Sequence, residues 1–280
     1  MSTLSRKIDF AVVFSVKNAN PNGDPLNGNR PRTDYDGYGE VSDVCLKRKI
    51  RDRLQGMGEA IFVQSDEKKQ DGMTSLRNRA ESDEFGLGKD AFNAKKSAPG
   101  ETAAQACKKW LDVRAFGQLF AFKVESKDGV SIPIRGPVSI HPAFSIEPVS
   151  ITSSQITKSV SGEGDGSKRG ADTMGMKHRV DDSIYVAFGA MSPQLAERTG
   201  FSDEDADKFK QVLPKLFEGD ASSARPEGSM AVEKVIWWEH ASKGGQYSSA
   251  KVHRSLRVSE DGTISLDELD GLAPEIIEGF

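Results

Sequence analysis

Hydrophobic residues along the chain gather into short runs that are separated by long polar stretches. The first run, Ile8 to Val16, is rich in Val, Ile and Phe, a composition typical of a strand buried in a sheet. Shorter runs of similar character follow, and they predict strands at 59–64, 130–134, 138–140, 183–188, 232–239 and 249–258.

Apolar residues at helical spacing predict three helices. Leu46, Ile50 and Leu54 recur behind Ser42, a good N-cap, so a helix is expected over 43–57. A second helix is expected over 102–111, and residues 112–124 then take on strand character. Ser202 is expected to cap a third helix that runs to about Phe217, with its apolar residues on one side.

The order of these elements is strand, helix, strand, followed again by strand, helix, strand. This order indicates an α+β fold built on a split βαβ unit, in a ferredoxin-like or RRM-like arrangement. Three polar stretches interrupt it: a Pro- and Gly-rich loop at 17–40, a charged insertion at 65–101 and a Gly-rich excursion at 151–182. Long ordered loops are usually functional, so we expect function in the projecting segments.

Composition limits the class of protein. The 280 residues suit one large domain with insertions or two small ones, and the two cysteines exclude a disulfide framework. No apolar stretch approaches the ~20 residues of a membrane span, and the first one is interrupted by Asp9 and Ser15, unlike a signal peptide. We therefore expect a soluble protein of the cytoplasm, with no membrane partner.

Net charge at first argues against nucleic-acid binding, because 38 basic residues face 42 acidic ones and the formal charge is −4. The acidic excess is local, however. Residues 258–280 hold seven acidic residues and no basic one, so residues 1–257 carry a net charge of +3. The sequence thus predicts a weakly basic body with an acidic C-terminal tail.

Basic residues concentrate in the first helix, which carries Lys47, Arg48, Lys49 and Arg51. A helical projection places Lys47, Arg48 and Arg51 away from the apolar stripe, and a solvated helix face is the simplest interpretation. The preceding loop adds Arg30 and Arg32, so two basic elements are tethered side by side, as a track for phosphates requires.

The loop also holds many asparagines, among them Asn18 and Asn20, which indicate either turn geometry or amides that hold sugar and phosphate. The excursion at 151–182 is similarly open to two interpretations. It is either a flexible surface loop, or a projecting element whose cations hold a nucleic-acid backbone while apolar residues such as Met174 and Met176 wedge between bases.

Metal and cofactor sites find little support. The segment 259–268 imitates half of an EF-hand, but Arg257 stands where the first carboxylate ligand is needed. The four histidines and two cysteines lack zinc-ligand spacing, and no nucleophile motif stands out. We expect no metal, no cofactor and no catalytic residues.

Several sequence blocks together resemble a known family. They are VKNANPNGDPLNGNRPRTDYDGYGEVSDVCLKRKIRD at 16–52, DVRAFG at 112–117, GPVSI at 136–140, SSQITKSV at 153–160 and MGMKHRVDDSIYVAFGAMSP at 174–193. With these blocks the chain resembles the backbone subunit of the type I-C CRISPR surveillance complex, Cascade, in the repeat-associated mysterious protein superfamily. The likeness covers most of the chain, and its first block is specific.

The resemblance implies a hand-shaped subunit with an RRM-like palm, fingers and a thumb. The implied division is palm with the early loop at 1–64, fingers at 65–101, palm again at 102–150, thumb at 151–182, palm at 183–258 and an acidic tail at 259–280.

The resemblance also implies the activity and the partners. Several copies would polymerise along one CRISPR RNA and present it in short segments to target DNA, forming an R-loop in antiviral defence. Partners would be the guide RNA, the heteroduplex and displaced strand of the DNA, other copies of the chain, other Cascade subunits and a recruited helicase-nuclease. A guide of arbitrary sequence must be held through phosphate, ribose and stacking.

The position of individual residues in these blocks makes them candidates for RNA binding. These candidates are Asn18, Asn20, Arg30, Arg32, Lys47, Arg48, Lys49, Arg51, Arg114, Gln155, Lys158, Lys168, Arg169, Met174, Lys177 and His178.

Two other functions compete with this hypothesis. Type III relatives cut RNA with an aspartate on an early loop, and this chain offers Asp24, Asp34 and Asp36 in a comparable stretch, where a bound metal could assist cleavage. A stand-alone RRM-like module that prefers one short RNA sequence is the other.

Overall fold

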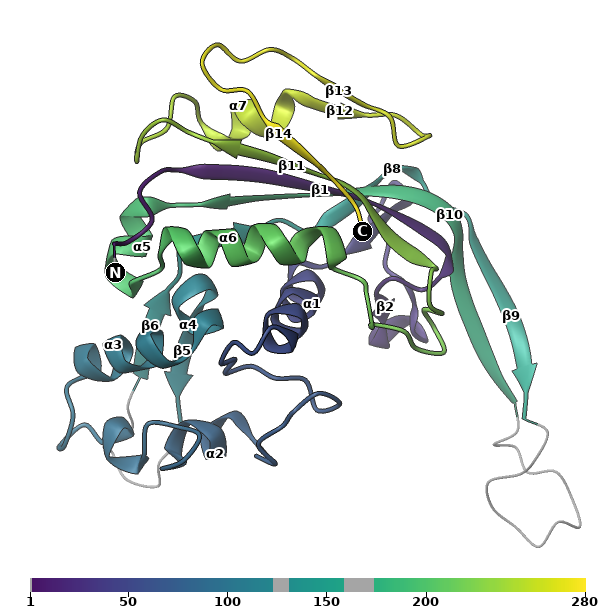
Figure 1. Cartoon of the computed structure of the whole chain (residues 1–280). Helices are drawn as coiled ribbons and strands as arrows, with labels where there is room; N and C mark the ends of the chain where they lie inside the picture. Colours follow the sequence, from purple (N-terminus) through teal and green to yellow (C-terminus); the bar gives the residue numbers. More distant parts are fainter. Residues whose placement is uncertain (1, 123–130, 159–173) are drawn as a thin grey trace, which may run out of the picture.

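A large antiparallel sheet organises the chain (Figure 1). The computed structural model describes residues 2–122, 131–158 and 174–280. The sheet runs in the order β14 (Glu275–Glu278), β11 (Met230–Glu239), β1 (Ile8–Ala19), β10 (Met174–Met191), β8 (Ala143–Pro148) and β4 (Tyr38–Val41). β7 (Val138–Ile140) and β9 (Ile151–Thr157) pair with the two ends of β10. The mixed α and β class predicted from the sequence is confirmed.

The centre of the sheet is β1, which pairs antiparallel with both β10 and β11. β10 and β11 are therefore parallel to each other, and α5 (Pro193–Thr199) and α6 (Asp203–Val212) connect them across one face of the sheet. α1 (Asp43–Gly56) packs on the same face beside α6. β1 thus lies between the parallel strands β10 and β11, which the helices connect. The core lies between the sheet and these helices.

The helix boundaries follow their capping residues. The Ser42 hydroxyl accepts the backbone N–H of Cys45 at the start of α1, and Leu46, Ile50 and Leu54 are buried as their spacing predicts. Ser202 and Asp205 form a capping box on α6, which passes into the short 3-10 helix η4 (Leu213–Lys215). The predicted helices at 43–57 and 202–217 are confirmed in their main part.

Residues 57–137 build a smaller unit with a core of its own, around Phe62, Phe92, Trp110 and Phe120. Its elements are α2 (Leu76–Glu81), η2 (Lys89–Phe92), α3 (Pro99–Lys109), α4 (Leu111–Phe116) and the hairpin of β5 (Gly117–Ala121) and β6 (Ser131–Arg135).

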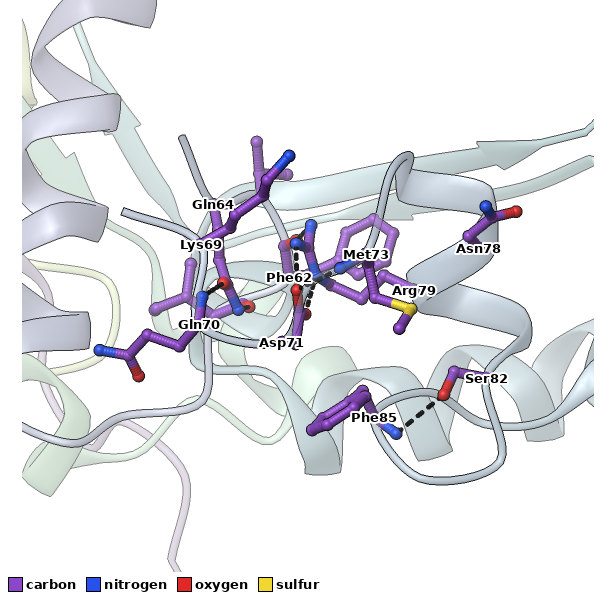
Figure 2. Close-up of polar contacts among 12 residues, drawn as sticks. Phe62, Gln64, Lys69, Gln70, Asp71, Met73, Asn78, Arg79, Ser82 and Phe85 are labelled. Carbon is purple, nitrogen blue, oxygen red and sulfur yellow. Dashed lines mark hydrogen bonds and ion pairs between the residues drawn. The ribbon is translucent and has the colours of Figure 1, made fainter. Parts of the chain in front are cut away.

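A buried ion pair supports this small unit (Figure 2). Arg79 is 4% exposed, donates to both carboxylate oxygens of Asp71 and also donates to the Phe62 carbonyl at 3.0 Å. The guanidinium is thereby paired on several sides, which offsets the cost of removing it from water. The polar segment 65–101 is consequently a packed insertion, in which a buried ion pair accompanies the aromatic core.

Three predicted strands are wrong in part. Residues 59–64 form no strand, because the backbone N–H groups of Phe62 and Val63 donate to the Asp112 carboxylate at 2.7 and 3.0 Å instead of to a neighbouring strand. Residues 112–116 belong to helix α4, and strand character begins only at Gly117. Residues 249–254 form the helix α7 (Ser249–Arg254), which is capped by Ser248, and only β12 (Leu256–Val258) is extended.

The C-terminal segment, expected as an acidic tail, is part of the folded body. β13 (Ile264–Leu266) pairs with β12, and β14 extends the edge of the large sheet beside β11. β12, β13 and α7 cover the face of the sheet opposite α1 and α6 (Figure 1). Leu272, 3% exposed, packs in this second layer.

The early loop at 17–40 also has regular parts. β2 (Gly23–Asp24) and β3 (Arg30–Pro31) pair antiparallel around the 3-10 helix η1 (Pro25–Asn27). The turn between them needs left-handed backbone at Gly28 and Asn29, which both have φ of 59°. Within the described residues, none of the helices has the length and apolar character needed to cross a membrane.

Candidate nucleic-acid interface

Two segments far apart in the sequence meet beside the end of β1. Ala19, the last residue of β1, pairs with Val180 of β10, and β3 of the early loop lies against β10. From this point β9 and the first half of β10 project from the body as a two-stranded ribbon (Figure 1). We call the ribbon of residues 151–157 and 174–182 the β9–β10 ribbon.

Several asparagines of the early loop hold the loop together. Asn20 is 3% exposed, and its amide donates to the Asn29 carbonyl at 2.7 Å. The Asn22 side chain accepts the Ser42 N–H and hydroxyl at 3.0 and 2.8 Å, which ties the loop to the start of α1. Both side chains are thus used in internal contacts, Asn20 within the loop and Asn22 with the start of α1.

The exposed groups of the early loop are of two kinds. Asn18, with a left-handed φ of 52°, and Arg30 on β3 present polar groups to solvent. Arg32 is half-buried, and its guanidinium lies 3.7 Å from the Asp24 carboxylate. Leu26 and Tyr35, at 98% and 105%, are fully exposed apolar side chains in the same loop.

The β9–β10 ribbon has two chemically different faces because side chains alternate along a strand. Met174 and Met176 share one face with Gln155, which stands opposite Met176 in the register. Lys177 and Arg179 share the other face with Ile156. Both methionines and both cations are exposed. For its described residues, the interpretation of 151–182 as a flexible loop is wrong.

The remaining predicted residues of this region are placed differently. His178 is buried at the base of the ribbon, where its Nδ1 lies 2.8 Å from the Ser153 hydroxyl. Lys158 is exposed just beyond β9. Lys168 and Arg169 lie outside the described residues.

The basic residues of α1 do not form an open face. Lys49 is 1% exposed and pairs with Asp220, while Arg48 contacts Asp52 at 2.9 Å and Asp220 at 3.1 Å. Burial lowers the pKa of the Lys49 ammonium. Burial opposes ionisation of Asp220 as well, yet the neighbouring Lys49 charge holds the pKa of its carboxyl below its usual range. Arg48 and Lys49 therefore do not fit the simple interpretation of a solvated helix face, because both pair with Asp220.

The other candidate cations of this region also meet carboxylates. Arg51 donates to Asp112 at 2.9 Å, and Arg114 grips Asp205 with two hydrogen bonds of 2.8 and 2.7 Å. Lys47 pairs with Asp43 at 2.9 Å. The DVRAFG block therefore joins α1, α4 and α6 through ion pairs.

The loop aspartates take part in turn geometry. Asp24 accepts the Leu26 N–H at 3.1 Å, and Asp34 accepts the N–H groups of Asp36 and Tyr38 at 3.0 and 2.9 Å. Across the described ranges, no group of three or more His, Cys, Asp or Glu side chains is placed to hold a metal ion.

Comparison with known proteins gives the family. The family model described as "CRISPR-associated protein Cas7" matches residues 6–270, nearly the whole chain. The chain belongs to the Cas7 family. A "CRISPR-associated protein Cas7" of Haloferax volcanii is 28% identical over 291 residues, which cover 99% of this chain and 82% of that protein.

Solved structures are also similar to this Cas7 chain. A chain of a "CRISPR RNA-guided surveillance complex, pre-nicking" matches with a TM-score of 0.49 at 15% identity, covering 83% of this chain and 78% of that one. A chain of a "CRISPR RNA-guided surveillance complex" matches with a TM-score of 0.44 at 15% identity, covering 83% and 68%.

In this Cas7 family member, Asn18 and Arg30 of the early loop and Gln155, Met174 and Lys177 of the ribbon are at exposed positions. The structure adds Leu26 and Tyr35, which sequence reasoning missed. The sequence did contain an indication of these two residues. Both are large apolar residues within a loop rich in Pro, Gly and Asn, where they are not expected to be part of a hydrophobic core.

Proposed function

We propose that this Cas7 family protein is the non-catalytic, RNA-binding backbone subunit of a type I-C Cascade surveillance complex. The family match supports the CRISPR context, and the sequence blocks at 16–52 and 174–193 support the type I-C assignment. The sheet unit in which β10 and β11 enclose β1 supports an RRM-like palm, with the packed insertion at 65–101 as fingers and the segment 151–182, which includes the β9–β10 ribbon, as thumb.

The observation that carries this proposal is the convergence of the early loop and the ribbon. The loop exposes Arg30 and Tyr35, and the ribbon exposes Lys177 on one face and Met174 on the other. Cations hold phosphates and apolar side chains stack on or wedge between bases, whatever the base. Such a surface suits a guide whose spacer sequence varies.

Direct contacts to the guide are proposed for the exposed candidates, which are Asn18, Arg30, Gln155, Lys158, Met174 and Lys177. The candidates Asn20, Arg32, Lys47, Arg48, Lys49, Arg51, Arg114 and His178 are proposed to position these elements through their internal contacts. Arg225 shows how such internal contacts connect α1 to the early loop. It lies 3.1 Å from the Asp220 carboxylate, which also pairs with Lys49 of α1, and within 3.5 Å of the Asn20 carbonyl of the early loop.

The proposed activity requires further partners. Copies of the chain polymerise head-to-tail along the guide, and such an interface joins two different surfaces that complement each other. The assembled guide pairs with target DNA in an R-loop, and cutting is left to a recruited helicase-nuclease.

Co-expression with a CRISPR array tests the proposal. The purified protein should retain CRISPR RNA of many spacer sequences, as shown by sequencing the bound RNA. Arg30→Ala combined with Lys177→Ala should lower guide retention at least threefold for all spacers and flatten its salt dependence. Lys234→Ala, on β11 and paired with Glu278 at 2.7 Å, is the matched control with one surface cation removed and should retain the guide.

Three outcomes would contradict the proposal. The first is retention unchanged in the double variant. The second is binding confined to one short RNA sequence, which indicates a stand-alone RRM-like module. The third is guide-directed cleavage of complementary RNA in Mg²⁺ that is lost in Asp34→Ala, which indicates a ribonuclease.

A further inference from the structure

A pocket of about 450 Å³ opens at the end of the sheet opposite the β9–β10 ribbon. Lys7 at the start of β1, the turn between β6 and β7, the end of β10 and the loop at 243–249 line it. The ribbon begins beside Ala19, which lies twelve residues along the strand from Lys7, or ~40 Å at about 3.3 Å per residue. The start of β1, which lies at the pocket, is therefore remote from the β9–β10 ribbon (Figure 1).

The charge of the lining is one-sided. Lys7, Arg135 and Lys243 line the pocket, and no Asp or Glu does. Arg135, exposed on β6, has no ion-pair or hydrogen-bond partner for its guanidinium among the described residues. Lys243 contacts Glu197 at 2.5 Å, but both side chains are about half exposed, at 53% and 51%. Such an exposed pair is weak and exchanges readily for another anion.

Lys7 is held in place at the pocket wall. Its ammonium donates to the Tyr247 carbonyl at 2.8 Å and lies 3.2 Å from the Asp9 carboxylate. An ammonium carries three donors, so one remains for a ligand. Gly245, with φ of 74°, passes close by, and a Cβ there would lie 2.7 Å from the Lys7 Cδ. The loop is thus shaped around this side chain.

Hydroxyl groups complete the lining. Ser139 donates to the Ala190 carbonyl at a long 3.3 Å, and Ser192 donates to the Gln194 amide oxygen at 3.0 Å. A hydroxyl rotates to suit a new acceptor. A guanidinium fork, two ammonium groups and two rotatable hydroxyls together match the several acceptor oxygens of a tetrahedral phosphate.

We propose that this pocket binds a phosphate group, supplied by a nucleic-acid strand that passes the end of the sheet remote from the guide site. The inference goes beyond the proposed function and does not depend on it, because inorganic phosphate probes the pocket without any guide RNA. A free nucleotide offers the same chemistry, and the experiment distinguishes the two sources.

The first arm measures thermal unfolding of the full chain with and without inorganic phosphate, against sodium chloride of matched ionic strength. Phosphate should raise the Tm of the wild type and of the control Arg254→Gln, an exposed arginine outside the pocket. Arg135→Gln combined with Lys243→Gln should lose most of this shift. An equal shift in all three proteins overturns the proposal.

The second arm measures the affinity of the same proteins for a fluorescent single strand between 50 and 200 mM salt. Loss of one phosphate contact should weaken binding about three- to tenfold at low salt and reduce the slope of log K against log salt by about 0.7. A lost phosphate shift with unchanged strand affinity supports the pocket with a free nucleotide as its ligand. Changed self-association without any phosphate response indicates an acidic protein segment instead and overturns the proposal.

Folding and guide binding are checked separately. Lys243 lies on an exposed loop, so Lys243→Gln alone serves as the second variant if the double variant unfolds. This variant should lose part of the increase in Tm that phosphate causes. A full wild-type increase in Tm counts against the proposal. Both variants should retain CRISPR RNA at the wild-type level, so a failure of this pocket and a failure of the proposed guide site give different results.

Discussion

The ammonium group of Lys49 is buried in the protein, where it pairs with Asp220 and lies over the ring of Phe217. The carboxylate of Asp9 on β1 is buried too, with the His240 Nε2 at 2.8 Å and the Lys7 Nζ at 3.2 Å from it. Breaking such a buried pair is costly because the remaining charge loses its partner. At the scale of single residues, the main effect of these buried charges is therefore on the stability of the fold.

Asp9 offers a test through pH. Burial opposes its charge, but His253, Ser249, His240 and Lys7 around it hold the pKa of its carboxyl well below the ordinary 3.8. The stability it contributes is therefore present above pH 3.8 and is lost as the pH falls towards the lowered folded-state pKa. Asp9→Asn should cost roughly 3 kcal/mol at pH 7 and only somewhat less at pH 3, where the folded-state carboxyl is still ionised, measured by urea unfolding.

The control for Asp9 is Asp267→Asn, whose carboxylate pairs with Arg257 at the surface. It should change the unfolding midpoint little at either pH. A wild-type midpoint for Asp9→Asn at pH 7 would show that the cluster around Asp9 contributes nothing to stability.

The two cysteines should differ in reactivity. Burial raises the pKa of the Cys107 thiol to about 11, so almost no thiolate forms at pH 8, whereas Cys45 is half-buried. We expect a thiol reagent to modify Cys45 in the native protein and Cys107 only after unfolding, as measured by mass spectrometry. The variant Cys45→Ala should then show no fast-reacting thiol, and fast labelling of Cys107 in it contradicts the expectation.

At the scale of elements, α1 connects the body to the early loop. Ser42 both caps the helix and donates to Asn22 at 2.8 Å, so one hydroxyl serves the helix and the loop. The ribbon is connected differently, because β10 is a single strand of 18 residues that continues from the sheet into the projection. The two halves of the proposed guide site are thus anchored in the central sheet and its first helix.

Ser42→Ala should therefore do more than weaken a helix. Loss of the cap costs about 1 kcal/mol, and the early loop also loses an anchor, so guide retention should fall as well. Ser75→Ala is the matched control, since Ser75 caps α2 by accepting the Asn78 N–H at 3.1 Å, in the unit at 57–137. Both variants should lose similar stability in urea unfolding, and only Ser42→Ala should retain less RNA. Equal retention would contradict the link between cap and loop.

At the scale of the whole molecule, the C-terminal segment is a structural layer. β14 supplies the edge of the sheet, and Leu272 packs with Trp238 and Val252 on the face opposite α1. The seven acidic residues beyond Arg257 therefore lie on an ordered surface of the body. The outer layer and the helical layer hold the central sheet between them, as expected for a sheet that is apolar on both faces.

Truncation after Arg257 should consequently abolish cooperative unfolding, because it removes β13, β14 and Leu272 together. Leu272→Ala is the milder variant and should cost about 3 kcal/mol in urea unfolding. Deletion of Phe280, which is 80% exposed, is the control and should cost less than about 1 kcal/mol. A truncated protein with wild-type stability would show that the segment is a solvated tail.

Local patterns predicted β1, β7, β11, the second half of β10 and two helices that pack on the sheet, but they missed β4, β8, β9 and β14. Apolar runs marked β1 and β11, and the spacing behind Ser42 and Ser202 marked α1 and α6. The prediction of a strand at 59–64 failed for a non-local reason. The Asp112 carboxylate accepts hydrogen bonds from the N–H groups of Phe62 and Val63, so these groups do not pair with another strand. The length of β10 was not predicted because its first half is mostly exposed and contains few apolar residues, so that it looks like a loop in sequence.

The sequence by itself determined the family and the elements of the core, because motif blocks and hydrophobic periodicity are local properties of the chain. Only the tertiary structure decided which cations are available to a polyanion. Lys49, Arg51 and Arg114 meet carboxylates 171, 61 and 91 residues away along the chain, while Arg30 and Lys177 stay exposed. Pairing over such distances depends on how distant segments pack, and no local pattern of charges contains that information.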